Sequence, residues 1–157
     1  MSPYIRRIMQ AHHRTDAGEQ RAERDFAGAK LILLIGPQLL VIRRDNDPAI
    51  PWPGRLDFPG GGREGAETPL DCALRETEEE IGLHLVRDDV AWRMWAERPH
   101  GPVWYFAARL DEHRADDIVF GDEGQGWFLM PPHAYRDHPS AIPHFADRLR
   151  DFLDSAA

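Results

Sequence analysis

Residues 61–83 read GGREGAETPLDCALRETEEEIGL. Thr68 is a favourable N-cap, Pro69 suits the first helical position, and Gly82 is a typical helix stop. The apolar residues between them recur at helical spacing and fall within an arc of roughly 100°. They are Leu70, Ala73, Leu74, Thr77 and Ile81. The stretch therefore predicts a helix over residues 68–81 that packs its apolar face on the core.

Glutamates crowd the second half of this helix. Glu76, Glu79 and Glu80 stand at i, i+3 and i+4 and share one face at the border of the apolar arc, whereas Glu78 points away from them. Like charges at this spacing repel, and acids near a helix C-terminus also oppose the macrodipole. One interpretation is a solvated acidic face. The other is a site for a hard divalent cation, which binds oxygen ligands.

The spacing of this stretch resembles the Nudix box, the signature of the Nudix hydrolases, written G-x5-E-x7-R-E-U-x-E-E-x-G-U with U apolar. All seven fixed positions are present: Gly61, Glu67, Arg75, Glu76, Glu79, Glu80 and Gly82. Average residue frequencies give a chance match at any one register on the order of 10⁻⁹ to 10⁻⁸. Thr77 replaces the first apolar residue, and it is small and apolar enough to pack there.

The resemblance implies a chemistry and a set of roles. Nudix hydrolases cleave a nucleoside diphosphate linked to another moiety and use Mg²⁺ or Mn²⁺. The implied metal ligands are the carboxylates of Glu76, Glu79 and Glu80 and the carbonyl of Gly60, the glycine just before the box. Arg75 matches the arginine that orients the catalytic glutamate. Glu67 matches a glutamate that braces the loop and helix, and Gly61 and Gly82 match structural positions.

The rest of the chain predicts an α+β domain. Strands are expected at residues 29–35, 39–43, 55–58, 86–90, 93–96, 103–110, 118–120 and 127–130. A second amphipathic helix is expected over residues 142–153, with Phe145, Leu149, Phe152 and Leu153 on one face. This order predicts a mixed, mostly antiparallel sheet between helices, the α/β/α sandwich that the resemblance implies. The predicted domain covers residues 27–157. Residues 1–26 form an N-terminal arm, partly helical or a strand laid on the domain.

Two carboxylates compete for the role of general base. Glu76 has the position in the box, held by Arg75, although its lone pairs are partly committed to a metal. Glu123 lies in the glycine-rich loop 121–126 and is free to move with it. Cys72 is expected to be a small packing residue, not a nucleophile. The His12-His13 pair is expected to belong to the polar arm.

Length and charge exclude several classes. The 157 residues correspond to one domain, without an apolar stretch long enough for a membrane span and without a signal peptide. A single cysteine indicates a reducing compartment and predicts a cytoplasmic location. The 19 Lys and Arg against 27 Asp and Glu give a net charge of −8, which disfavours bulk nucleic-acid binding but not a small nucleotide held through a metal. The sequence also permits a homodimer.

Three hypotheses follow for the function. The first is a metal-dependent hydrolase of pyrophosphate linkages in nucleotides. The second is a catalytically inactive Nudix-fold nucleotide-binding or sensor module, which usually has a degraded glutamate set. The third is an acidic cation-binding or interaction protein. For the substrate, Pro99 lies 16 residues after the box, near a proline of ADP-ribose-type enzymes, whereas the short chain looks more like nucleoside triphosphate pyrophosphatases.

Overall fold

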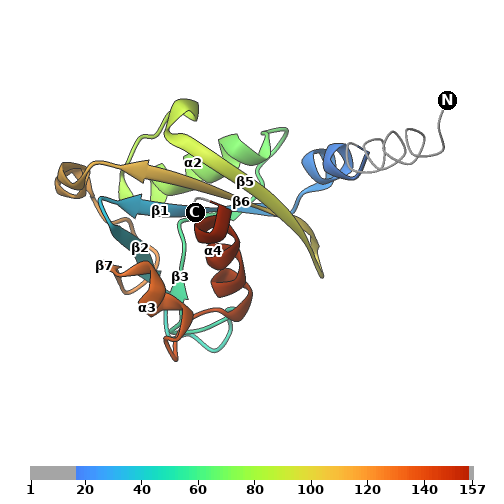
Figure 1. Ribbon diagram of the computed structural model, residues 1–157. Helices are drawn as coiled ribbons and strands as arrows, with labels where there is room; N and C mark the ends of the chain where they lie inside the picture. The colour runs from blue at the N-terminus through green and yellow to red at the C-terminus, as the bar shows by residue number, and fades with distance from the viewer. Residues whose placement is uncertain (1–16, 156–157) are drawn as a thin grey trace.

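The computed structural model describes residues 17–155 (Figure 1). Seven strands form one sheet with the path β3-β2-β1-β6-β5, to which β4 and β7 add by pairing with β1 and β2. The strands are β1 (Gly28–Ile35), β2 (Gln38–Arg43), β3 (Leu56–Asp57), β4 (Gly60–Gly62), β5 (Val90–Arg98), β6 (Gly101–Leu110) and β7 (Gly126–Met130). Among them β1 and β6 run parallel and the other named pairs antiparallel. The predicted mixed, mostly antiparallel sheet is confirmed.

Strand β1 lies at the centre of the sheet and is forked along one edge. Its C-terminal residues Leu34 and Ile35 pair with β2, whereas its N-terminal segment, from Gly28 to Lys30, pairs with β4. Its other edge pairs along its whole length with β6. Because β2 and β4 share one edge of β1 at different ends, they diverge from each other. The candidate site lies at this divergence.

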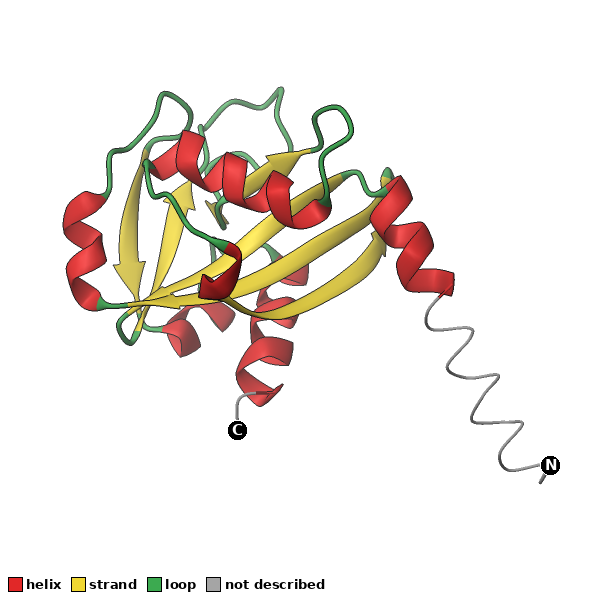
Figure 2. Ribbon diagram, turned by 90° about the horizontal axis from the view of Figure 1, so that it is seen from above, coloured by secondary structure: helices red, strands yellow, loops and turns green. Residues whose placement is uncertain are grey.

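Two long helices cover the two faces of the sheet (Figure 2). Helix α2 (Pro69–Ile81) buries Ala73, Thr77 and Ile81 against one face, and α4 (Pro143–Ser155) buries Phe145, Leu149 and Phe152 against the other. The two predicted helices and their buried faces are therefore confirmed. Within residues 17–155, none of the helices combines the length and the apolar character that a bilayer crossing requires.

Local sequence signals explain the bounds of α2. The Thr68 side chain accepts a hydrogen bond from the Asp71 amide, and Gly82 ends the helix in the left-handed conformation, at φ 70°, that glycine adopts without strain. Thr77 is fully buried, and its hydroxyl donates to the Ala73 carbonyl at 2.7 Å. This hydrogen bond satisfies the polar atom that Thr77 brings to an apolar position.

Several element predictions were wrong. Residues 86–90 are mainly a 3₁₀ turn, η1 (Arg87–Asp89), and β5 begins only at Val90. Residues 118–120 form no strand, because the Val119 amide donates to the Ile81 carbonyl at the end of α2. Residues 60–62, which lie outside every predicted strand, form β4. A short helix α3 (Pro132–Arg136) and a second 3₁₀ helix, η2 (Glu112–Asp117), were not anticipated.

Residues 17–25 form an N-terminal helix that packs on the domain. The carbonyl of Ala22 accepts a hydrogen bond from the Trp104 indole, and Ala22 and Phe26 are buried in the core beneath α2. Arg93 of β5 pairs with Glu19 and Glu23 of the helix. Of the two alternatives for the arm, this segment is helical. Residues 1–16, with His12 and His13, lie outside the described residues, and the domain boundary at residue 26 stays a prediction.

Candidate active site

A pocket of about 480 Å³ opens where β2 and β4 diverge from each other along one edge of β1. It contains two of the box glutamates, Glu76 and Glu80, and the three glycines of β4. Glu123, from the loop before β7, lines the same pocket. The pocket also contains Lys30, Arg44 and Asp57. The structure thus brings the glycine run, the glutamate helix and the candidate loop base together, although Glu123 is 47 residues from Glu76 in the chain.

The backbone of β4 passes close to the glutamate face. Hydrogen bonds with β1 hold this strand, with Gly61 opposite Ala29. A Cβ atom on Gly61 would lie 2.7 Å from the carboxyl carbon of Glu76, whereas one on Gly62 would meet nothing within 4 Å. Glycine at position 61 therefore leaves the space that the Glu76 carboxylate occupies.

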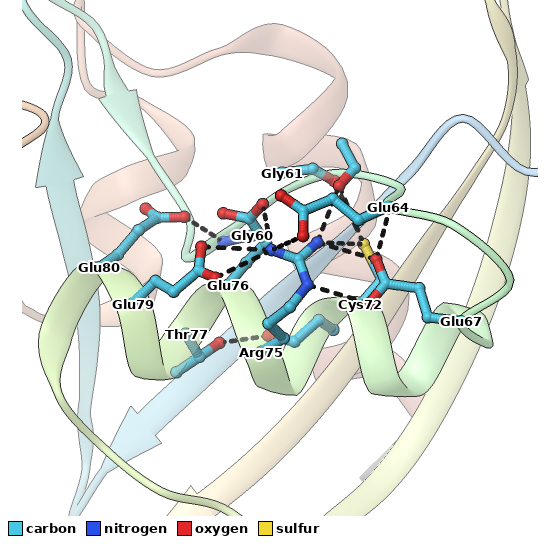
Figure 3. Close-up of polar contacts among 12 residues, drawn as sticks. Gly60, Gly61, Glu64, Glu67, Cys72, Arg75, Glu76, Thr77, Glu79 and Glu80 are labelled. Atoms are coloured by element: carbon cyan, nitrogen blue, oxygen red, sulfur yellow. Dashed lines mark hydrogen bonds and ion pairs between the residues drawn. The ribbon is translucent and has the colours of Figure 1, made fainter.

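Arg75 organises the carboxylates around it (Figure 3). Its Nε and Nη2 donate to the two oxygens of Glu67 at 2.9 and 2.8 Å, a bidentate pair. Its Nη1 donates to Glu76 at 3.0 Å and reaches Glu79 at 3.2 Å, and Nη2 also donates to the Gly62 carbonyl. The hydrogen bonds from Arg75 lower the pKa of Glu67 to about 2. Arg75 thereby joins the loop before α2 to two of the box glutamates.

Glu80 lies in a different environment. Its Oε1 accepts a hydrogen bond from the Gly60 amide at 3.0 Å. Burial, only partly offset by the nearby Lys30 charge, raises the pKa of Glu80 to about 8. The neighbouring protein groups therefore only partly compensate the negative charge of an ionised Glu80 carboxylate.

Lys30 and Arg44 form a cationic cluster around Asp57 in the same pocket. Lys30 Nζ donates to Asp57 at 3.0 Å and to the Gly60 carbonyl at 3.1 Å, and Arg44 Nη1 donates to Asp57 at 2.8 Å. Sequence reasoning missed these three residues. Two signals were available: Lys30 is the only lysine in the chain, and it lies inside an otherwise apolar strand.

The other two glutamates of the α2 helix, Glu79 and Glu78, lie outside the pocket. Glu79 is 56% exposed in its side chain, against 18% for Glu76, and it is not among the residues lining the pocket. In residues 17–155 no three Asp, Glu, His or Cys side chains converge closely enough to hold a metal ion, and the Arg75 guanidinium lies between Glu76 and Glu79. Glu78 is exposed and contacts His84, as expected for the glutamate that points away.

Cys72 and Pro99, which the sequence also singled out, both lie outside the lining of the pocket. Cys72 is fully buried, and desolvation raises the pKa of its thiol to about 12, as suits a packing residue. Its Sγ contacts the carbonyls of Gly61 and Gly62. Pro99 lies in the turn between β5 and β6 and does not line the pocket.

Two curated proteins are similar to part of this chain. A curated 8-oxo-dGTP diphosphatase of Haemophilus influenzae is 35% identical over 79 residues, which are 50% of this chain and 57% of that protein. An RNA pyrophosphohydrolase of Psychrobacter arcticus is 29% identical, over 56% of this chain and 63% of that protein. The chain thus spans about three fifths of the length of these curated relatives.

The fold has solved counterparts. The crystal structure of a C. elegans Ap4A hydrolase binary complex superposes with a TM-score of 0.66 at 19% identity, covering 82% of this chain and 97% of that one. At this identity the likeness concerns the fold. Residues 26–152 match the family model for the NUDIX domain. These residues include the whole glutamate helix, the glycine strand and the pocket between them, and the protein is therefore a member of the NUDIX family.

Proposed function

We propose that this protein is a metal-dependent pyrophosphohydrolase that cleaves the pyrophosphate linkage of a nucleoside diphosphate linked to another moiety. One observation carries the proposal: Glu76, Glu80 and the β4 backbone line a single pocket together with Lys30 and Arg44. Carboxylates for a metal and cations for phosphate are therefore at hand in one place. The printed names of the relatives, diphosphatases and pyrophosphohydrolases, support this reaction class.

The donor chemistry of the implied ligands fits a hard divalent cation, although their side chains would have to draw together around it. The implied ligands Glu76, Glu79, Glu80 and the Gly60 carbonyl offer only oxygen atoms, the donors that Mg²⁺ and Mn²⁺ prefer. The raised pKa of Glu80 marks a buried carboxyl group that lacks a full compensating charge. A bound cation would neutralise substrate phosphate charge and lower the pKa of an attacking water.

The protein side chains have distinct roles in this proposal. Glu76, Glu79 and Glu80 would hold the cation, and Arg75 orients Glu76 because it donates to that carboxylate at 3.0 Å. Glu67 fixes the guanidinium of Arg75 through two hydrogen bonds. Water attack on phosphorus requires a base, for which Glu76 and Glu123 remain the candidates. Both line the pocket.

We expect the substrate to be a nucleotide from one of two candidate groups. Nucleoside triphosphates, including oxidised ones, agree with the 8-oxo-dGTP diphosphatase relative. ADP-ribose-like substrates rest on Pro99 alone, which lies away from the pocket. We expect a cytoplasmic enzyme, in keeping with its single cysteine, and a homodimer stays a prediction.

A turnover screen tests the proposal. The purified protein is incubated with Mg²⁺ and a panel of nucleoside triphosphates, 8-oxo-dGTP, ADP-ribose, NADH, dinucleoside polyphosphates and CoA, and the products are resolved by chromatography. Cleavage of a pyrophosphate linkage that stops on addition of EDTA supports the enzyme. Nucleotide binding without turnover on any substrate would instead favour the inactive binding module.

Divalent metal is expected to stabilise the fold. Because Glu76, Glu79 and Glu80 repel one another, a cation that binds only the native state should raise the melting temperature as Mg²⁺ or Mn²⁺ increases. Thermal scans with increasing metal and with EDTA measure the effect. A melting temperature that responds to neither reagent up to millimolar metal would argue against the site.

Gly61→Ala is expected to reduce turnover about ten- to hundredfold while the fold is retained. The new Cβ would lie 2.7 Å from the Glu76 carboxyl carbon, at the movable end of a side chain, so the carboxylate must shift. Gly62→Ala is the matched control, because its Cβ meets nothing within 4 Å. Steady-state kinetics and circular dichroism of both variants check this. Equal activity of the two variants would show that the position of Glu76 does not limit the reaction.

A further inference from the structure

A second, larger cleft of about 790 Å³ lies outside the catalytic pocket. It is bounded by the N-terminal helix, the start of α2, η1 and β5. Gly62 lines the catalytic pocket and Arg63 lines this cleft, so the chain after β4 separates the two. Figure 2 shows the N-terminal helix at one end of the sheet, away from α4. A volume of this size is typical of small-molecule sites, which occupy roughly 300–1,000 Å³.

Four arginines converge on the cleft from four separate segments. Arg24 comes from the N-terminal helix, Arg63 from the chain after β4, Arg87 from η1 and Arg93 from β5. We call this feature the arginine cleft. Such a concentration of positive charge is unexpected in a protein of net charge −8. A cleft of this kind attracts anions, since it focuses the field of its charges.

Acidic side chains already engage two of the four arginines. Glu23, which lines the cleft, and Glu19 pair with Arg93, and Asp25 pairs with Arg24. Glu67 lines the cleft, but its carboxylate is held by the two hydrogen bonds from Arg75. Arg63 donates to the carbonyls of Arg24 and Gly65, and none of the described carboxylates forms an ion pair with it. Arg87 has a single, long contact of 3.4 Å with Asp71. Arg63 and Arg87 are therefore the guanidinium groups most available to an anion.

The cleft also has a nonpolar side. Its lining includes the almost fully buried Trp104 and Phe106 and the half-buried Leu70 and Val90. The Arg93 guanidinium lies 5.5 Å from the centre of the Trp104 ring, so flat cationic and aromatic groups already stack here. Guanidinium planes and apolar walls are suitable surfaces for a planar heterocycle.

The N-terminus of α2 adds to the anion preference. Thr68, Pro69 and Leu70 line the cleft, so the positive end of the 13-residue helix faces it. The Asp71 amide is already bonded to the Thr68 side chain, so the contribution of the helix is its dipole more than a free donor.

We propose that the arginine cleft is a second binding site that takes a nucleoside phosphate, with the phosphate on Arg63 and Arg87 and the base against the apolar wall. The combination of guanidinium donors with a nonpolar interior favours this class over inorganic phosphate and over an uncharged aromatic compound. The site is built from residues that the proposed catalytic reaction does not use, so it stands independently of that reaction.

The test is calorimetric titration of the whole 157-residue chain with AMP in EDTA. AMP lacks a pyrophosphate bond and is not consumed, and EDTA removes metal-dependent binding in the catalytic pocket. Arg87→Gln and Arg63→Gln are each expected to weaken AMP binding about tenfold, because each removes a charged donor. Arg150→Gln is the matched control: it lies on α4, and its contact with Asp147 is also 3.4 Å. Melting temperatures establish that the variants are folded. If Arg63→Gln does not fold, Arg87→Gln carries the test, because Arg87 is exposed.

Two further comparisons test whether binding needs both the base and the phosphate, and whether AMP binds in the cleft and not in the catalytic pocket. Adenosine and inorganic phosphate are each expected to bind at least tenfold more weakly than AMP. Arg44→Gln, in the catalytic pocket, should bind AMP as the wild type does. The proposal is overturned if AMP does not bind in EDTA, if Arg87→Gln behaves like Arg150→Gln, or if Arg44→Gln abolishes binding. Turnover with Mg²⁺ is measured separately, so failure of the enzyme proposal and failure of the cleft are distinguishable.

Discussion

Glu79→Gln and Glu80→Gln are each expected to reduce turnover by several orders of magnitude while the fold is retained. Each substitution keeps the side-chain shape and removes one negative charge from the proposed metal ligands. At Glu80 the glutamine can still accept the hydrogen bond from the Gly60 amide, so the β4 backbone should stay in place. At Glu79 the side chain is more than half exposed, so little packing is lost.

Glu78→Gln provides the matched control. Glu78 belongs to the same helix and carries the same charge, but it is exposed and contacts His84, away from the pocket. Turnover at saturating Mg²⁺ and circular dichroism of the three variants compare them directly. If Glu79→Gln or Glu80→Gln keeps more than about a tenth of wild-type turnover, the ligand assignment at that position is wrong.

Glu76→Gln is expected to reduce turnover by about 10²–10⁴, the usual scale for loss of a general base. Glu76 is held by Arg75 and lies against Gly61, so its carboxylate is fixed at the pocket. Glu123→Gln is expected to cost only a few-fold. Its side chain is exposed on the loop before β7 and lines the same pocket, so it is the competing candidate.

Single-turnover rates with metal affinity measured in parallel separate the two carboxylates. A metal ligand that is not the base should lose affinity for Mg²⁺ together with rate, whereas a base should lose rate at saturating metal. A large loss in Glu123→Gln, with a small loss in Glu76→Gln and unchanged metal affinity in both, would move the base to the loop. That result would leave the metal assignment of Glu79 and Glu80 in place.

The sequence was most informative where interactions are local. The bounds of α2 follow from Thr68, Pro69 and Gly82 because caps and stops act within one turn. The buried faces of α2 and α4 follow from helical periodicity for the same reason. Residues 118–120 were wrongly predicted as a strand: Ile118 and Phe120 pack against the core, whereas Val119 is exposed and its amide donates to the Ile81 carbonyl at the end of α2.

Positions of charged side chains were harder to predict. Lys30, Arg44 and Asp57 meet in one pocket because β1, the chain after β2, and β3 converge there, and nothing in their local sequence indicates it. The divergence of β2 from β4 along one edge of β1 depends on strand pairing between residues far apart in the chain. A short glycine strand such as β4 has no alternation of apolar and polar residues from which its pairing could be predicted.

By itself, the sequence determined the helix that carries Glu76, Glu79 and Glu80, their common face, and the family to which that spacing belongs. These properties depend on residues within a few turns of one another, whose geometry is fixed by the helix itself. Only the tertiary structure decided that Glu123 shares a pocket with Glu76, that Glu80 is half-buried beside Gly60, and that four arginines form a separate cleft. Those arrangements result from pairing and packing of distant segments, because burial and charge environment are properties of the assembled fold and not of any one segment.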